Sequence, residues 1–193
     1  MRGLLIALEG LDQSGKQTQA ELLRDRLIER GRDVRLLSFP DYGTVIGAEI
    51  GRALRGERPY GPDTMQLLYV ANRYEWKQRM VDGKTAGAIL LCDRYLASSV
   101  AYGEAQGLDA DWLVEIQRYL PQPDVTILLD ILPDESVRRK GAGRDSYERD
   151  LALLARVRDS YLRQATGGWA RIAADRDRDA VAAEVFAAVA RWL

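Results

Sequence analysis

The chain has 193 residues, 47% of them hydrophobic, which suits one compact domain with a sizeable core. Its 28 basic and 29 acidic residues give a net charge of −1, which argues against a nucleic-acid binder held by bulk charge. Because histidine is absent, nucleophilic schemes and metal sites that need histidine are excluded, and catalysis must rest on lysine, arginine, carboxylates, the backbone and a hard cation.

The expected location is the cytoplasm. Cys92 is the single cysteine, which excludes an intrachain disulfide and suits a reducing compartment. No run of about 18 apolar residues occurs, and the apolar N-terminal stretch ends at Glu9, so neither a membrane span nor a signal peptide is expected. Since no repeat or linker is present, residues 1–193 are expected to form a single domain.

The N-terminal stretch carries the strongest functional signal. Residues 4–8 are an apolar run typical of a buried strand, and a helical pattern follows Lys16. Between them lies the pattern G-x(4)-G-K, made by Gly10, Leu11, Asp12, Gln13, Ser14, Gly15 and Lys16. In this context it predicts a phosphate-binding loop, in which backbone N–H groups and the helix N-terminus bind phosphates and Lys16 reaches the outer ones.

The position after the lysine departs from the usual motif. It is normally Ser or Thr, whose hydroxyl ligates magnesium, but here it is Gln17. Thr18 is one position later and is turned by about 100° around the helix, so it cannot simply replace that hydroxyl. Either the Gln17 amide oxygen substitutes, or the magnesium is held by water, phosphates and carboxylates elsewhere.

Strands and helices alternate along the rest of the chain. Strands are expected at 34–39, 88–92, 125–130 and 169–173, and helices at 44–54, from 62 or 63 to about 81, after Tyr95, from Asp109 or Asp111, and at 133–139, 146–164 and 180–193. This order predicts a three-layer α/β fold with a five-stranded parallel sheet and helices on both faces. Ligands of such sheets bind beyond the carboxyl ends of the strands, so Gly10, Pro40 and Asp93 should meet there.

Several side chains near these strand ends are candidates for a site. Asp93 suits either a magnesium-linked carboxylate or a helix N-cap, and Arg94 is a fork-shaped donor that can bridge two phosphoryl groups. Two helix faces, one with Tyr69 and Arg73 and the other with Tyr95, Ser99 and Tyr102, carry the aromatic and polar groups that a nucleobase pocket needs. Such stripes are, taken alone, more often core packing.

The basic segment at about 138–147, with glycines between its cations, predicts a lid that closes over phosphates, with a solvated loop as the alternative. Glu148, one turn into the next helix, is a candidate for a second magnesium-side carboxylate.

Six motifs in the right order resemble those of thymidylate kinases. They are Glu9 to Lys16, Phe39-Pro40, Ala71-Asn72-Arg73, Asp93-Arg94-Tyr95, Leu120 to Asp124, and Tyr147-Glu148. The resemblance covers nearly the whole chain. It implies transfer of the γ-phosphoryl group of Mg-ATP to dTMP, giving dTDP and ADP in dTTP synthesis, with residues 10–18 binding ATP. It also implies a homodimer formed through helices.

The resemblance implies roles residue by residue. Asp12 would take the sugar 3′-hydroxyl, Tyr69 would stack on thymine, Arg73 would bond to its O4, Ser99, beside Ser98, would lie near N3, Tyr102 would crowd the 2′ position, and Phe39 and Pro40 would border the base and sugar. Arg94 would clamp both substrates' phosphates, and Lys16, Asp12 and Arg94 would be catalytic. Gln13 occupies the position at which one subgroup has a catalytic arginine, so the lid cations Arg139, Lys140 and Arg144 are expected to supply that charge.

Two other functions remain open at this point. The nearest is a kinase for another deoxynucleoside or nucleoside monophosphate. The more distant is a guanine-nucleotide switch protein that binds partners, although the Asn-Lys-x-Asp motif that reads guanine is missing.

Overall fold

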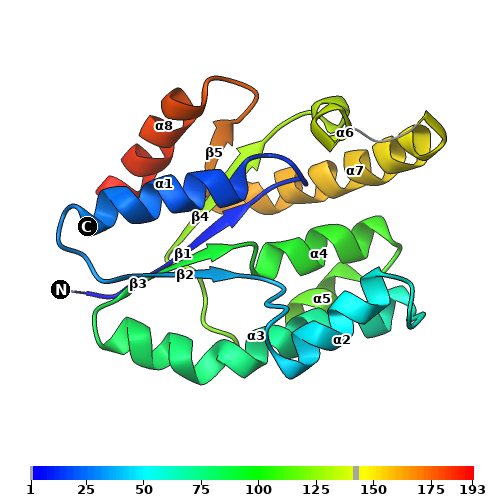
Figure 1. Cartoon of the computed structure of the whole chain (residues 1–193), viewed down its shortest axis with the longest axis horizontal. Helices are drawn as coiled ribbons and strands as arrows, with labels where there is room; N and C mark the ends of the chain where they lie inside the picture. The colour runs from blue at the N-terminus through cyan, green and yellow to red at the C-terminus, as the bar shows by residue number, and fades with distance from the viewer. Residues whose placement is uncertain (1, 141–143) are drawn as a thin grey trace.

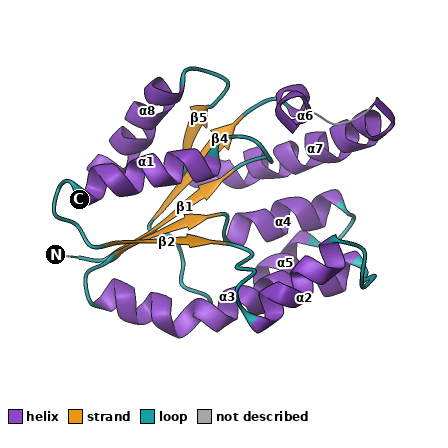
Figure 2. Cartoon of the chain, in the orientation of Figure 1, coloured by secondary structure: helices purple, strands orange, loops and turns teal. Residues whose placement is uncertain are grey.

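The structure is a computed structural model that describes residues 2–140 and 144–193, without the side chains of residues 140 and 144–150. Its centre is one parallel sheet in the order β2-β3-β1-β4-β5 (Figures 1 and 2). The strands are β1 (Leu4–Glu9), β2 (Val34–Ser38), β3 (Ile89–Asp93), β4 (Val125–Asp130) and β5 (Ala170–Ala173). The predicted fold class is confirmed.

The helices lie on both faces of this sheet (Figure 1). They are α1 (Lys16–Ile28), α2 (Val45–Leu54), α3 (Pro62–Thr85), α4 (Leu96–Ala105), α5 (Ala110–Glu115), α6 (Pro133–Lys140), α7 (Arg144–Gln164) and α8 (Arg178–Ala190). Helices α1 and α8 pack together on one face, and α3, α4 and α7 lie on the other. No helix among the described residues is long and apolar enough to cross a membrane.

The central strand β1 is buried along its whole length, because both of its faces are covered. Leu4, Ile6 and Leu8 belong to the large core cluster, whereas Leu5 and Ala7 belong to a smaller cluster with Met80 of α3. The continuous apolar run is therefore explained by burial on both faces. The register pairs Leu8 with Asp93, so the loops after β1 and β3 begin side by side.

Four local predictions need correction or refinement. Helix α3 ends at Thr85 rather than Val81, and α7 begins at Arg144, two residues before Ser146. Asp109, not Asp111, is the N-cap of α5, because its carboxylate accepts from Trp112 N at 2.7 Å. Helix α8 spans Arg178–Ala190 rather than residues 180–193.

Candidate active site

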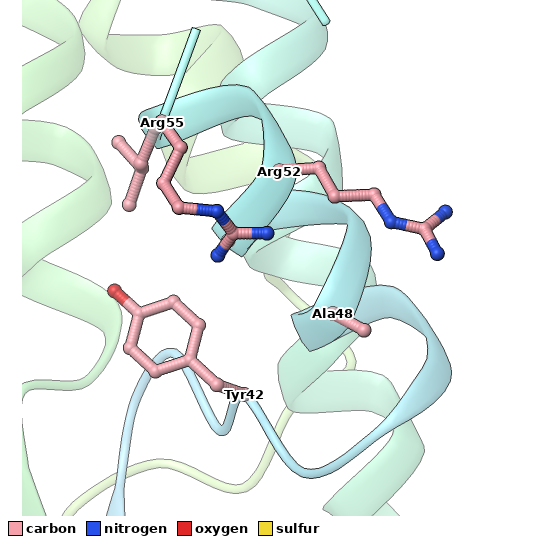
Figure 3. A pocket seen from close by; sticks show the side chains of 6 residues that line it. Tyr42, Ala48, Arg52 and Arg55 are labelled. Atoms are coloured by element: carbon pink, nitrogen blue, oxygen red, sulfur yellow. The ribbon is translucent and has the colours of Figure 1, made fainter. Parts of the chain in front are cut away.

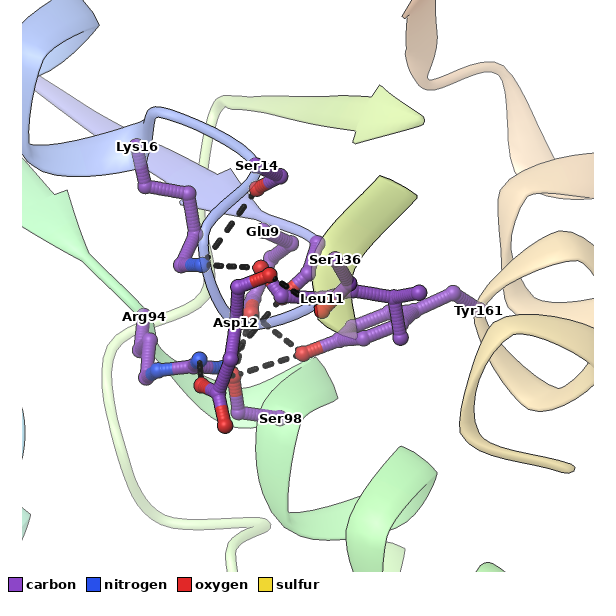
Figure 4. A network of polar contacts seen from close by, with 10 residues as sticks. Glu9, Leu11, Asp12, Ser14, Lys16, Arg94, Ser98, Ser136 and Tyr161 are labelled. Atoms are coloured by element: carbon purple, nitrogen blue, oxygen red, sulfur yellow. Dashed lines mark hydrogen bonds and ion pairs between the residues drawn. The ribbon is translucent and has the colours of Figure 1, made fainter. Parts of the chain in front are cut away.

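The loop after β1 folds as a phosphate-binding loop. Gly10 and Gly15 have positive φ angles of 144° and 89°, and a Cβ on Gly10 would lie 2.4 Å from the Leu129 carbonyl oxygen. Only glycine fits there. Lys16 is 6% exposed and lies at the start of α1, where its Nζ donates to Leu11 O at 2.6 Å (Figure 4). The lysine side chain therefore lies over its own loop.

Helix α6 holds the outer side of this loop. Ser136 Oγ donates to Asp12 O at 2.7 Å, and Arg139 Nη1 donates to Gln13 O at 3.1 Å. Arg139 also contacts Glu135, with 2.5 Å between Nε and Oε1. The structure therefore brings the first lid cation to the loop, beside Gln13. The side chains of Lys140, Arg144 and Glu148, and with them most of the predicted lid, lie outside the described residues.

Burial of Lys16, helped by the nearby charge of Arg94, lowers its pKa to about 7. Bound phosphates would favour the ammonium form and raise this pKa again. We therefore expect nucleotide binding at pH 8 to take up as much as about one proton per site, falling toward zero well below pH 7 where Lys16 is already protonated. Calorimetric titration in buffers of different ionisation enthalpy measures this uptake, and its persistence in Lys16→Met would contradict the assignment.

Arg94 follows β3 with a φ of 63°, in the left-handed region that arginine rarely adopts. Its guanidinium forms an ion pair with Asp12 and donates to Gly10 O at 3.3 Å and Ser98 Oγ at 3.4 Å (Figure 4). Its Cζ atom lies 5.3 Å from the centre of the Tyr102 ring. Arg94 thus joins the phosphate loop to the neighbouring cavity.

The N-cap alternative for Asp93 is wrong. The N-cap of α4 is Tyr95, which makes no side-chain cap bond, and the carboxylate that accepts from Tyr95 N, at 2.9 Å, is that of Glu9. Asp93 Oδ1 is buried without a hydrogen-bond partner among the described residues, and burial raises the pKa of this carboxyl. An unpaired carboxylate oxygen at the edge of a phosphate loop fits a cation.

Magnesium needs few protein ligands, since it keeps several waters and is held by one or two carboxylates and the substrate phosphates. The unpaired carboxylate oxygen of Asp93 fits this pattern. Gln17 is exposed, and its Nε2 donates to Glu21 Oε1 at 3.0 Å. This bond uses the NH₂ group of the Gln17 amide and not its oxygen, which is the atom predicted as a possible magnesium ligand.

A cavity of about 410 Å³ lies beside Arg94, between α3, α4 and the loop after β2. All nine side chains predicted for the acceptor site line it, namely Asp12, Phe39, Pro40, Tyr69, Arg73, Arg94, Ser98, Ser99 and Tyr102. Sequence reasoning did not include five further lining residues, namely Tyr42, Leu54, Met65, Gln66 and Gln106. Tyr42 follows the Phe39-Pro40 motif by two positions, and this proximity was the available signal.

The polar floor of this cavity is Arg73, which is 3% exposed. Its Nη1 donates to Ser99 Oγ at 2.7 Å and to Gln117 Oε1 at 3.1 Å. Tyr69 stands on the same side of α3, and burial raises the pKa of its phenol to about 12, so the ring is uncharged. An uncharged aromatic ring and a buried guanidinium thus share one wall.

Glu9 is a further site residue that the sequence reasoning missed. It is fully buried, and Oε2 accepts from Ser98 Oγ at 2.6 Å and from Tyr161 Oη at 3.4 Å (Figure 4). Because Glu9 also caps α4, one carboxylate ties β1, α4 and α7 together beneath Arg94. The available signal was a carboxylate that ends a fully apolar strand.

A wider hollow of about 540 Å³ adjoins the acceptor cavity over α2 and shares Tyr42 and Leu54 with it (Figure 3). Its charged residues, Arg52 and Arg55, are already paired with Glu49 and Glu57. The smaller cavity contains Arg94, Asp12 and the buried Arg73, so we assign the chemistry to it despite its size.

A phosphate-binding loop whose Asp12 and Arg94 line a cavity of about 410 Å³ is the arrangement expected of a P-loop nucleoside monophosphate kinase. The comparisons agree. The family model described as thymidylate kinase matches residues 8–185, and the chain belongs to this family. It is therefore an ATP-dependent nucleoside monophosphate kinase.

Individual relatives resemble the chain over most of its length. Thymidylate kinase of Schizosaccharomyces pombe is 38% identical over 77% of this chain and 70% of its own. The probable thymidylate kinase of Pyrococcus abyssi is 39% identical over 86% and 84%, respectively. A solved structure of thymidylate kinase from Candida albicans has a TM-score of 0.85 at 30% identity and covers 98% of this chain and 92% of its own.

Proposed function

We propose that this enzyme transfers the γ-phosphoryl group of Mg-ATP to dTMP, giving dTDP and ADP for dTTP synthesis. The observation that carries the choice of acceptor is Arg73, a buried guanidinium in the wall of the acceptor cavity. Tyr69 would stack on the base, with Ser99 near N3 and Tyr102 against the 2′ position. Asp12 would bind the 3′-hydroxyl, and Phe39 and Pro40 would border the base and sugar.

The reaction needs no nucleophilic side chain, because an oxygen of the acceptor phosphate attacks the γ-phosphorus in line. Residues 10–18 would hold the ATP phosphates, with Lys16 at the outer ones. Arg94 would bridge the two substrates, and Arg139 with Arg144 would add lid charge to the transferring group. The chemistry that magnesium supplies when bound is neutralisation of phosphate charge, and Asp93, with Glu148, would hold it.

The choice of pyrimidine follows from the chemistry of Arg73. A guanidinium has only donors, so it favours a base with a carbonyl at position 4 over cytosine, whose amino group there is also a donor. Two donors that face each other are both left unpaired, which costs ~1–3 kcal/mol and corresponds to roughly 5- to 150-fold discrimination. Stacking on Tyr69 contributes little to this choice, because every base has a π-face.

We therefore expect kcat/KM to be highest for dTMP, intermediate for dUMP, which lacks only the methyl group, and lowest for dCMP. The ratio of dTMP to dCMP should fall in Arg73→Ala. Steady-state assays of the wild type and the variant with the three monophosphates measure this. Comparable wild-type values for dTMP and dCMP would show that Arg73 does not read the base.

A kinase with a broader range of monophosphates is the second candidate. The solved Candida albicans thymidylate kinase is described as having broad substrate specificity, and it covers nearly the whole chain. The same assays, extended to purine monophosphates, decide between the two. A switch protein is disfavoured by the second cavity beside the phosphate loop, which contains the buried cation Arg73.

A homodimer and a cytoplasmic location complete the proposal. Leu67 and Val81 are exposed on α3, and Tyr74 lies midway between them at seven-residue spacing, so one side of the helix offers an apolar stripe to a second copy. Sedimentation velocity of the full chain measures the oligomeric state. The single cysteine, Cys92, is buried and free, which suits a reducing compartment that also supplies ATP.

A further inference from the structure

The guanidinium of Arg73 donates a hydrogen bond to Gln117, a residue that does not line the acceptor cavity. Gln117 is 2% exposed and lies just after α5, whereas Arg73 is on α3 and Ser99 on α4. Gln117 and Arg73 are separated by 44 positions in the sequence. Residues of α3, α4 and the turn after α5 thus meet at one buried cation.

The amide of Gln117 can offer only its oxygen to Arg73. Its Nε2 donates to Leu113 O at 2.8 Å and to Leu96 O at 3.3 Å. A flipped amide would set its NH₂ group against the guanidinium and its oxygen against two carbonyls, leaving buried polar groups unpaired on both sides. The backbone of α5 and the start of α4 therefore fix the direction of this acceptor.

Both side-chain acceptors that the structure gives Arg73, the Ser99 hydroxyl and the Gln117 amide oxygen, are uncharged. They bind the same nitrogen, Nη1, and so restrain the guanidinium without cancelling its charge. A carboxylate at the same place would orient Arg73 but would also compete with a ligand for that charge. An amide leaves the charge available to a neutral carbonyl in the cavity.

We propose that Gln117 is the positioning residue for recognition of the acceptor base. It aims Arg73 so that the N–H groups not bound by Gln117 and Ser99 meet a pyrimidine that has a carbonyl at position 4. Selectivity would then depend on a side chain that no substrate touches. This inference rests on the proposed function of Arg73 as the group that reads the base.

Two substitutions separate positioning from a structural role. Gln117→Met keeps the length of the side chain but removes both the acceptor and the donors, whereas Gln117→Glu restores an acceptor toward Arg73 without the amide donors. We expect Gln117→Met to lower kcat/KM for dTMP about tenfold, mainly through KM, with a much smaller effect for dCMP. Gln117→Glu should recover only part of this loss, because its carboxylate orients Arg73 but also competes with the base for the charge and has no donor for the Leu96 and Leu113 carbonyls. If Gln117 only ties α4 to α5 through its NH₂ group, the two variants should be equally impaired, and the proposal is overturned.

A double-mutant cycle with Arg73→Ala tests the route of the effect. Gln117→Met should have little further effect on dTMP use in the Arg73→Ala background, and equal fold losses in both backgrounds would overturn the proposal. Should Gln117→Met fail to fold, Gln117→Asn, which withdraws the amide by one methylene, takes its place in the cycle.

The same cycle measured by chemical unfolding reports the Gln117–Arg73 contact without any substrate. If the two substitutions are coupled in unfolding but Arg73→Ala keeps the wild-type ratio of kcat/KM for dTMP to kcat/KM for dCMP, the proposed function of Arg73 would be overturned. The role of Gln117 in positioning Arg73 for the base would be overturned with it. If Arg73→Ala loses the preference for dTMP over dCMP in kcat/KM, but the two substitutions show no coupling in unfolding, only the role of Gln117 would be overturned.

Discussion

Replacing Lys16 with methionine should lower kcat about 10³-fold or more, because the variant lacks the cation that stabilises negative charge on the transferring phosphoryl group in the transition state. The ammonium group is already placed by Leu11 O, at 2.6 Å, and by the N-terminus of α1. Lys16 lies at the phosphate loop and does not line the acceptor cavity, so the loss should be in turnover more than in acceptor affinity. Methionine fills a similar volume and leaves the loop backbone in place.

The same substitution should not destabilise the nucleotide-free protein. Burial lowers the pKa of Lys16 to about 7, so the folded state binds its proton more weakly than the unfolded state does. Below pH 7 both states are protonated and the cost of the buried ammonium is fully present. Between about pH 7 and 10.5 only the unfolded state keeps the proton, so this cost falls as the pH rises.

We therefore expect Lys16→Met to melt at or above the wild-type temperature near pH 6, with the largest gain at low pH, while the rise in melting temperature caused by ATP is much reduced. Thermal unfolding with and without ATP, alongside a coupled assay, measures both effects. A folded variant that keeps near wild-type kcat would contradict the assignment of the phosphate loop.

The sheet and the phosphate loop could be predicted from the sequence because both are local patterns. The run Leu4 to Leu8 has no polar residue, as burial on two faces requires, and the glycine spacing before Lys16 is set by loop geometry. The predicted acceptor residues gather at one cavity because strand ends and helix faces place them there. Their individual roles stay predictions until the variants are measured.

Long-range contacts explain what the sequence did not reveal. Asp93 has the position of a helix cap, yet Glu9, 86 residues away from Tyr95, supplies the capping carboxylate across the strand end. Gln117 looks like any polar residue after a short helix, and its contact with Arg73 exists only once α3, α4 and α5 are packed. The start of α7 at Arg144 was likewise not predicted, because no strong N-cap residue precedes it in the sequence.

Removing the guanidinium of Arg94 should cost about 10²- to 10³-fold in kcat, since this side chain joins Asp12 and the loop carbonyl of Gly10 to the acceptor cavity. Arg94→Lys should recover only part of the loss, because an ammonium keeps the charge but not the fork that can bridge two phosphoryl groups. Steady-state kinetics with saturating ATP and dTMP compare kcat of the wild type, Arg94→Ala and Arg94→Lys.

The unusual backbone at Arg94 supplies the control. At a φ of 63°, any residue with a Cβ is strained, so Arg94→Gly should be more stable to unfolding than Arg94→Ala by about 1 kcal/mol. Both variants lack the guanidinium, however, and should lose kcat to the same extent. If activity instead followed stability, with Arg94→Gly nearly as active as the wild type, the contribution of Arg94 would lie in the shape of the loop and not in its charge. Equal kinetic losses at unequal stabilities would assign the effect to the guanidinium itself.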